Sequence, residues 1–338
     1  MAWRNVGAPP RPAQGAVASH ADGSIIRVVT ADTPSAPCGV CGATRWRTIA
    51  RTIDDQHGTP GSFAFAQCLV CSHVQSAADP EIALAAYPAD YAAHEIEIGR
   101  EPNRLLRWNR RLGLSRRCAL VESRVRAGRI LDVGCGRGHF LAAMSRRGWS
   151  VLGVEPSARA AARAREEYGL PIHAGTLRDM GRSAEFDVVT LWHVLEHVTD
   201  PATLLDDAWH VLRPDGLVVI ETPNVDSVDR RLFGRHWTGW DPPRHLHLFG
   251  PRILAQILVR HGFTEVDVQC RSGSWMGLSM SLRNLARSRG LSTSGMTGDG
   301  ALHLQAARAL ATPYLTLIDR LRLGSVITAM ARSSARAS

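Results

Sequence analysis

The chain has 338 residues, and its hydrophobic content of 45% is ample for a folded core of one large domain or two. No apolar run reaches the ~18 residues that a membrane span needs, and residues 1–17 lack the apolar segment of a secretory signal, so we expect a cytoplasmic protein, with peripheral membrane contact left open. The formal net charge is +9, and all 40 basic residues are arginine, which favours carboxylate and phosphate partners, although biased codon composition is the preferred explanation. The charge is scattered along the chain and only weakly suggests nucleic acid.

The chain begins with a segment rich in proline, alanine and glycine. This composition predicts a mobile arm over residues 1–33, apart from a short strand at residues 24–29.

Two pairs of cysteines follow the arm, each pair spaced C-x-x-C and separated from the other by 26 residues. Two such knuckles can fold four thiolates onto one tetrahedral ion, so residues 34–95 are predicted to form a zinc-ribbon-like module with structural Zn²⁺. Two disulfides are the alternative, which a reducing compartment disfavours. His57 and His73 are predicted to be surface residues, because four cysteines already complete a closed site. The predicted ligands are Cys38, Cys41, Cys68 and Cys71.

One or two amphipathic helices are predicted over residues 101–127, and the segment RILDVGCGRGHF at 129–140 comes next. Its apolar residues predict a buried strand that ends near Asp132. Three alternate glycines then predict a tight turn into a helix, at which the backbone can approach a ligand closely. A dinucleotide fingerprint needs glycine where His139 stands, so that ligand is disfavoured.

The pattern D-x-G-x-G-x-G resembles motif I of the class I S-adenosylmethionine (SAM) methyltransferases. The resemblance implies an α/β fold with a Rossmann-like seven-stranded sheet in the order 3-2-1-4-5-7-6, the seventh strand antiparallel. It also implies that SAM is the cofactor and that the motif holds its methionine part. The residues so assigned are Asp132, Gly134, Cys135, Gly136 and Gly138.

Strands and helices alternate after the glycine turn, which predicts a parallel sheet covered on both faces. The second strand ends at Glu155, whose carboxylate can accept both ribose hydroxyls, although a helix-capping role is the alternative. Thr176 and Leu177 follow the third strand, where the resemblance implies contacts with adenine.

The segment WHVLEHVTDP after the fourth strand resembles the equivalent segment of the same family. Trp192 and His193 lie at the carboxyl end of that strand, where ligands bind in open α/β sheets. Trp192 is predicted to contact the cofactor, and His193 is predicted to be a site residue. His193 and His197 are four residues apart, but the order H-V-L-E-H is not the zincin order H-E-x-x-H, which disfavours a metal at this pair.

A polar segment at residues 234–251 contains three histidines, two tryptophans and two arginines. His245 is predicted to be the general base or a substrate ligand, with His193 as the second candidate base and with Arg244 and His247 behind His245. An ordered loop without a chemical role is the alternative. The cysteine knuckles, a YPxDYxxH segment and a PRHLxxF segment together resemble one branch of the family, with an N-terminal zinc module. Tyr87, Tyr91 and His94 therefore line the substrate side or pack the joint between domains.

Residues 96–338 are predicted to form the methyltransferase domain, with a helical insertion at 271–320 before the last strand. The insertion could serve as a substrate lid, a dimer face or a membrane-surface patch.

The resemblance implies methyl transfer from SAM to an oxygen or carbon of a small molecule, such as a sugar, a glycolipid or a secondary metabolite. An RNA methyltransferase that grips nucleic acid with its zinc module is one alternative, and a SAM-binding scaffold without catalysis is another. The sequence does not identify the acceptor, the base or the oligomeric state.

Overall fold

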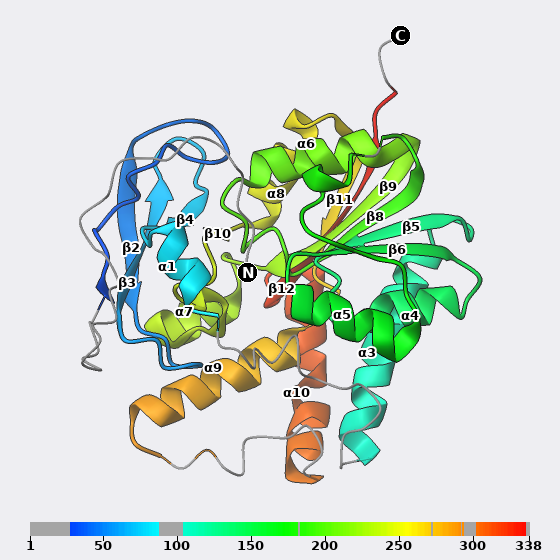
Figure 1. Cartoon of the computed structure of the whole chain (residues 1–338). Helices are drawn as coiled ribbons and strands as arrows, with labels where there is room; N and C mark the ends of the chain where they lie inside the picture. The colour runs from blue at the N-terminus through cyan, green and yellow to red at the C-terminus, as the bar shows by residue number, and fades with distance from the viewer. Residues whose placement is uncertain are drawn as a thin grey trace.

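The computed structural model describes residues 28–87, 104–181, 183–271, 273–291, 293 and 302–335. Figure 1 shows a smaller sheet on the left, coloured blue to cyan, beside a larger twisted sheet on the right, with α9 and α10 below them. Most of the predicted arm lies outside the described residues. Of its predicted strand, the structure describes β1 (Val28–Val29).

The larger sheet has seven strands in the order β11-β12-β9-β8-β5-β6-β7, which confirms the predicted order. Strands β5 to β9 run parallel, and β12 runs antiparallel to its neighbours β9 and β11. The carboxyl ends of the parallel strands therefore meet at one edge of the sheet. The strands are β5 (Arg129–Val133), β6 (Ser150–Glu155), β7 (Ile172–Ala174), β8 (Phe186–Trp192), β9 (Leu212–Pro223), β11 (Phe263–Gln269) and β12 (Val326–Ser333).

Helices cover both faces of this sheet because successive strand residues point to opposite sides. Ile130 packs with residues of α3 and α4, whereas Leu131 next to it packs with residues of α6 and α8. The helices are α1 (Pro80–Ala85), α3 (Arg104–Glu122), α4 (His139–Ser145), α5 (Ala158–Tyr168), α6 (Pro201–Val211), α7 (Val228–Phe233), α8 (Pro251–Arg260), α9 (Ser274–Ser288) and α10 (Leu302–Arg320). Single 3₁₀ turns are η1 (Arg178–Met180), η2 (Gly234–His236) and η3 (Thr238–Trp240).

Residues Arg213–Gly216 lie inside β9 as an irregularity of the strand. Leu212 pairs with Phe186 and Leu217 pairs with Val188, so four residues of β9 face one residue of β8. Asp215 at the centre has a φ of 63°. The strand thus absorbs these residues as a bulge.

The smaller sheet combines segments that lie far apart in the sequence. It contains β1, β2 (Trp46–Thr52), β3 (Gly61–Cys68), β4 (Val74–Ser76) and β10 (His247–Leu248). Because β10 pairs with β4, the polar segment after β9 contributes a strand to the sheet that carries the cysteine knuckles. The N-terminal region is therefore fastened directly to the loop that contains His245.

The predicted insertion contains the two expected helices, α9 and α10, and the expected last strand follows as β12. Helix α9 lies against the polar segment, where the hydroxyl of Ser281 accepts the N–H of Thr238 at 3.0 Å. No helix in the described part of the chain is long and apolar enough to cross a membrane.

Candidate functional site

The glycine turn after β5 has the backbone conformation that its sequence predicts. Gly134, Gly136 and Gly138 have φ angles of 69°, 52° and 76°, which side chains with a Cβ rarely adopt. The N–H of Gly134 donates to the carbonyl of Val154 at 2.7 Å and holds the turn against β6. The turn therefore presents backbone, with no side chain on alternate residues, at the carboxyl edge of the sheet.

Glu155, the last residue of β6, lies directly beside this turn. One carboxylate oxygen accepts the N–H of Gly136 at 2.8 Å, and the other accepts the N–H of Ser157 at 2.8 Å. The side chain is buried. The structure thus brings the predicted ribose-binding carboxylate to the glycine turn, where each of its oxygens keeps further acceptor capacity.

Asp132 is buried in β5, just before the glycine turn. The hydroxyl of Thr190 donates to its Oδ1 at 2.6 Å. Burial raises the pKa of Asp132 to about 7, although the Thr190 hydrogen bond and the charge of Arg117 act in the other direction. A cationic group bound nearby would favour the ionised carboxylate.

The remaining residues predicted to contact the cofactor differ in their surroundings. The Trp192 ring packs edge-on to Phe140 with ring centres 5.3 Å apart, and its Nε1 is buried without a hydrogen-bond partner among the described residues. Leu177 is buried in the core, whereas Thr176 donates through both its N–H and its hydroxyl to Asp179. The thiol of Cys135 is half-buried, and burial raises its pKa.

His193 lies at the carboxyl end of β8 between two carboxylates. Its Nδ1 is 2.9 Å from an oxygen of Glu196, and its Nε2 is 3.4 Å from an oxygen of Glu221. Burial alone would lower the pKa of His193, but hydrogen bonds with these carboxylates raise it to about 9. His193 is therefore a cation at neutral pH and holds no lone pair there for the general-base role that its sequence position suggested.

The side chain of His245 lies close to those of Glu196 and His197. The ligand-type atoms of these three side chains all lie within 4.8 Å of one another. The His245 and His197 rings are 4.7 Å apart, and the hydroxyl of Tyr87 lies 2.8 Å from Nδ1 of His197. Sequence reasoning singled out His245 and named Tyr87, but it missed Glu196 as a partner of His197 and His245. The available signal was the position of Glu196 directly before His197.

Burial and mutual contact also set the charges of this group. The pKa of Glu196 falls to about 2, because its hydrogen bond with His193 outweighs its burial. Burial and the neighbouring His245 lower the pKa of His197 to about 4. At neutral pH the group thus contains an anionic carboxylate and a neutral His197 imidazole.

Two residues predicted to lie behind His245 occupy other environments. Arg244 is fully buried, and its guanidinium contacts both Asp54 and Asp241. His247 is also buried, and its ring stacks on that of His73 at 5.2 Å. These positions do not agree with substrate contact, because the side chains are enclosed by the joint between the two sheets. Tyr91 and His94 lie outside the described residues.

Four cysteine sulfurs gather at the end of the smaller sheet. The Sγ atoms of Cys38 and Cys71 are 3.6 Å apart, as are those of Cys41 and Cys68, and all four lie within 4.8 Å of one another. All four cysteines are free. Sulfurs bound to one zinc at about 2.3 Å are about 3.8 Å apart in a tetrahedron, so this group fits that ion.

The two histidines near the knuckles were both predicted to be surface residues. His57 is exposed as expected, but His73 is fully buried, with its Nδ1 3.5 Å from the sulfur of Cys38. The prediction for His73 was wrong because this residue, directly before β4, lies between the knuckles and β10.

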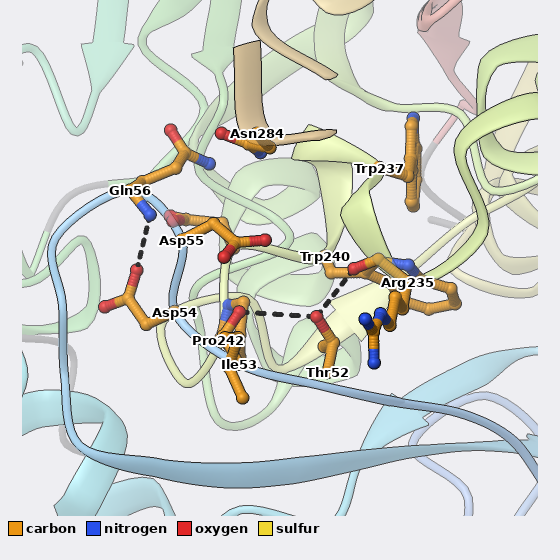
Figure 2. A pocket seen from close by; sticks show the side chains of 11 residues that line it. Thr52, Ile53, Asp54, Asp55, Gln56, Arg235, Trp237, Trp240, Pro242 and Asn284 are labelled. Atoms are coloured by element: carbon orange, nitrogen blue, oxygen red, sulfur yellow. Dashed lines mark hydrogen bonds between the residues drawn. The ribbon is translucent and has the colours of Figure 1, made fainter. Parts of the chain in front are cut away.

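A small pocket lies at the joint between the two sheets. Figure 2 shows that Asp55 and Gln56, from the loop after β2, face Trp237 and Trp240 across it, with Asn284 of α9 at one side. None of its lining residues belongs to the glycine turn. We therefore interpret it as a packing seam, not as the candidate site.

Comparison with known proteins agrees with the geometry of the larger sheet. Residues 97–268 match the sequence profile of a family described as "Methyltransferase domain". Ubiquinone biosynthesis O-methyltransferase of Bradyrhizobium sp. (strain ORS 278) is 40% identical over 101 residues, which are 28% of this chain and 40% of that protein. The protein of the same name from Psychrobacter arcticus is 37% identical over 158 residues, which are 41% of this chain and 60% of that protein.

The chain thus spans 40% and 60% of the length of these two relatives. Among solved structures, a SAM-dependent methyltransferase from Archaeoglobus fulgidus is similar, with a TM-score of 0.45 and 19% identity over 66% of this chain and 94% of that one.

Proposed function

Because the chain belongs to the methyltransferase-domain family, we propose that it transfers the methyl group of SAM to an oxygen of a small organic acceptor, with a carbon acceptor as the alternative. The observation that carries the proposal is the contact between Glu155 and Gly136, which joins the ends of β5 and β6 into one ligand-binding edge. The two relatives are named as O-methyltransferases, which favours oxygen as the acceptor atom.

The residues at this edge fit SAM. We assign the ribose hydroxyls to Glu155 and the methionine part to Asp132 and the glycine turn, because SAM carries a cationic amine that a buried carboxylate would bind. Trp192, whose buried Nε1 has no hydrogen-bond partner among the described residues, is assigned to the same edge. When bound, SAM supplies an electrophilic methyl group, so the chain's main tasks are to position the acceptor and to exclude water.

The acceptor is assigned to the side of the site formed by His193 and His245. The two ring nitrogens of His193 face Glu196 and Glu221, so its contribution is its positive charge, which would favour negative charge on an acceptor oxygen nearby. His245 donates its Nδ1–H to the carbonyl of Gly239 at 2.8 Å, which leaves its Nε2 with a lone pair. We therefore assign removal of the acceptor proton to the His245 side and not to His193.

We propose that the four cysteines hold a structural zinc ion. They are free, they have the separation of a tetrahedral set, and the sulfur of Cys38 has His73 as a neighbour that can donate a hydrogen bond to it. Free thiols in this arrangement agree with a reducing compartment, and the cytoplasmic location stays a prediction.

The acceptor class can be identified with methyl-labelled SAM and an extract of the host cell. We expect label in the small-molecule or lipid fraction, and we expect His245→Ala to reduce it by roughly 10²–10⁴-fold, the range of one general acid–base contribution. His57→Ala, at an exposed histidine, is the matched control and should retain the activity. Label in RNA would contradict the proposal, and SAM binding without label in any fraction would favour a binding scaffold.

Glu155→Ala is expected to weaken SAM binding by about 1–3 kcal/mol, because charged hydrogen bonds to the ribose are lost and the glycine turn loses an acceptor. Titration calorimetry would measure the change. The control is Glu185→Ala at the opposite edge of the sheet, where the carboxylate pairs with Arg129. Equal affinity in the Glu155→Ala variant would refute the assignment.

A further inference from the structure

Three side chains of types that bind metals converge behind His193. Glu196 and His197 come from the turn after β8, and His245 comes from the loop before β10. The backbone fastens these two loops together, since the carbonyl of Glu196 accepts the N–H of Leu246 at 2.7 Å and that of His247 at 3.1 Å. The three side chains are therefore presented by a fixed joint.

Nδ1 of each imidazole lies next to a backbone carbonyl. Nδ1 of His245 lies 2.8 Å from the carbonyl of Gly239, and Nδ1 of His197 lies 3.2 Å from the carbonyl of Arg244. The Tyr87 hydroxyl, whose oxygen can also accept, lies 2.8 Å from the same nitrogen of His197. A carbonyl can only accept, so each ring carries its proton on Nδ1 and its lone pair on Nε2. This arrangement is typical of metal-binding histidines, whose second nitrogen donates to a backbone carbonyl or a carboxylate.

Glu196 supplies the third group. Its Oε1 is 2.9 Å from His193, whereas its Oε2 is buried and has no hydrogen-bond partner among the residues that the structure describes. A buried carboxylate oxygen is rarely left without a partner. The oxygen and the two Nε2 lone pairs thus form a set of acceptors that a cation would satisfy.

We propose that Glu196, His197 and His245 bind one divalent transition-metal ion, as a set of two histidines and one carboxylate with open coordination positions. Two nitrogen ligands favour such an ion over Mg²⁺ or Ca²⁺, which prefer oxygen. This set differs from the pair His193 and His197, whose four-residue spacing is compatible with metal binding on a helix, because His193 is turned toward two carboxylates. His245 arrives from a separate loop 48 residues after His197, so no short motif shows the set.

The role of the ion rests on the proposed function, whereas its binding does not. An acceptor hydroxyl bound at an open position would release its proton to water more readily, and its oxygen would then attack the methyl group. Nε2 of His245 would be a metal ligand in this case, and the ion would take over the activation that His245 alone was assigned.

The test uses Mn²⁺ as the probe and the full chain loaded with zinc at its cysteines. Thiolates retain zinc, whereas Mn²⁺ is suited to carboxylate ligands and does not compete for sulfur. Unbound Mn²⁺ is followed by electron paramagnetic resonance. We expect one Mn²⁺ per chain in the wild type, at least tenfold weaker binding in Glu196→Gln and His197→Gln, and unchanged binding in His57→Gln. Absence of Mn²⁺ binding to the wild type, or equal binding by all variants, would overturn the proposal.

Two further comparisons separate the outcomes. Thermal unfolding identifies any variant that does not fold, and His197→Gln, at a half-buried position, decides the matter if Glu196→Gln is unstable. Methyl transfer that survives removal of all metal outside the cysteine site would overturn the role of the ion while leaving the proposed function intact. Absence of methyl transfer by the wild type while it binds Mn²⁺ would instead count against the proposed function.

Discussion

Replacing Arg244 with alanine is expected to lower the free energy of unfolding by about 3–5 kcal/mol. The guanidinium is fully buried and binds both oxygens of Asp54 at 2.9 Å, and it also donates to Asp241 at 2.6 and 3.1 Å. Its presence holds the pKa of each carboxyl below the ordinary value, although burial would raise both. Without it, two buried carboxylates lose their cation.

The effect should be larger than that of losing one ion pair, because Asp54 also orders its own loop. Its oxygens accept the N–H groups of Gln56, His57 and Thr59. Arg244 therefore connects the β2–β3 loop of the smaller sheet with the segment that carries His245. We expect the Arg244→Ala variant to lose methyl transfer as well, through displacement of that segment.

Urea unfolding of the wild type and the variant would measure the change. The control is Arg147→Ala, whose pair with Glu122 is partly exposed and should contribute at most about 1 kcal/mol. Arg244→Lys keeps the charge but cannot reproduce contacts with two carboxylates at once, so it should lie between the two. If Arg244→Ala lowers the free energy of unfolding no more than the control does, the buried guanidinium does not stabilise the fold.

The case of Arg244 shows where sequence reasoning stops. The strands, the glycine turn and Glu155 were predictable because each is specified by neighbours within a few residues: alternating apolar positions, glycines that need positive φ, and an acidic residue at a strand end. One of the two carboxylates that Arg244 binds, Asp54, is 190 residues away, and no local pattern connects them. Arginine between histidines in a polar loop therefore resembled a substrate contact.

The same limit applies to the histidines. His193, His197, His245 and His247 all lie in segments that the sequence marks as important, yet their roles depend on which carboxylates and carbonyls the fold brings to each ring. His193 becomes a cation because Glu196 and Glu221 flank it, and Glu221 comes from the neighbouring strand β9. The parallel order of β8 and β9 predicts that their carboxyl ends meet, but not which side chains touch.

Removing zinc is expected to unfold the smaller sheet while the larger one stays folded. The cysteines lie on the turns that start β2 and end β3, so the ion closes the end of that hairpin. Structural zinc contributes about 10–16 kcal/mol of binding free energy in zinc-finger peptides, which is comparable to the whole stability of a small domain. Treatment with a chelator should therefore expose the amides of β3 and β4, measured by hydrogen exchange with mass spectrometry.

The larger sheet should keep its protection, because the strands β5 and β8 are buried between helices on both faces and contain none of the four cysteines. Cys68→Ser should likewise reduce the zinc content from one ion per chain, whereas Cys118→Ala in α3 should not. Full zinc content in the Cys68→Ser variant would refute the four-cysteine site. Unfolding limited to the smaller sheet would also affect catalysis, because β10 pairs with β4 and loss of zinc would release the loop that holds His245. We therefore expect methyl transfer to fall, whereas SAM binding at β5 and β6 should not weaken.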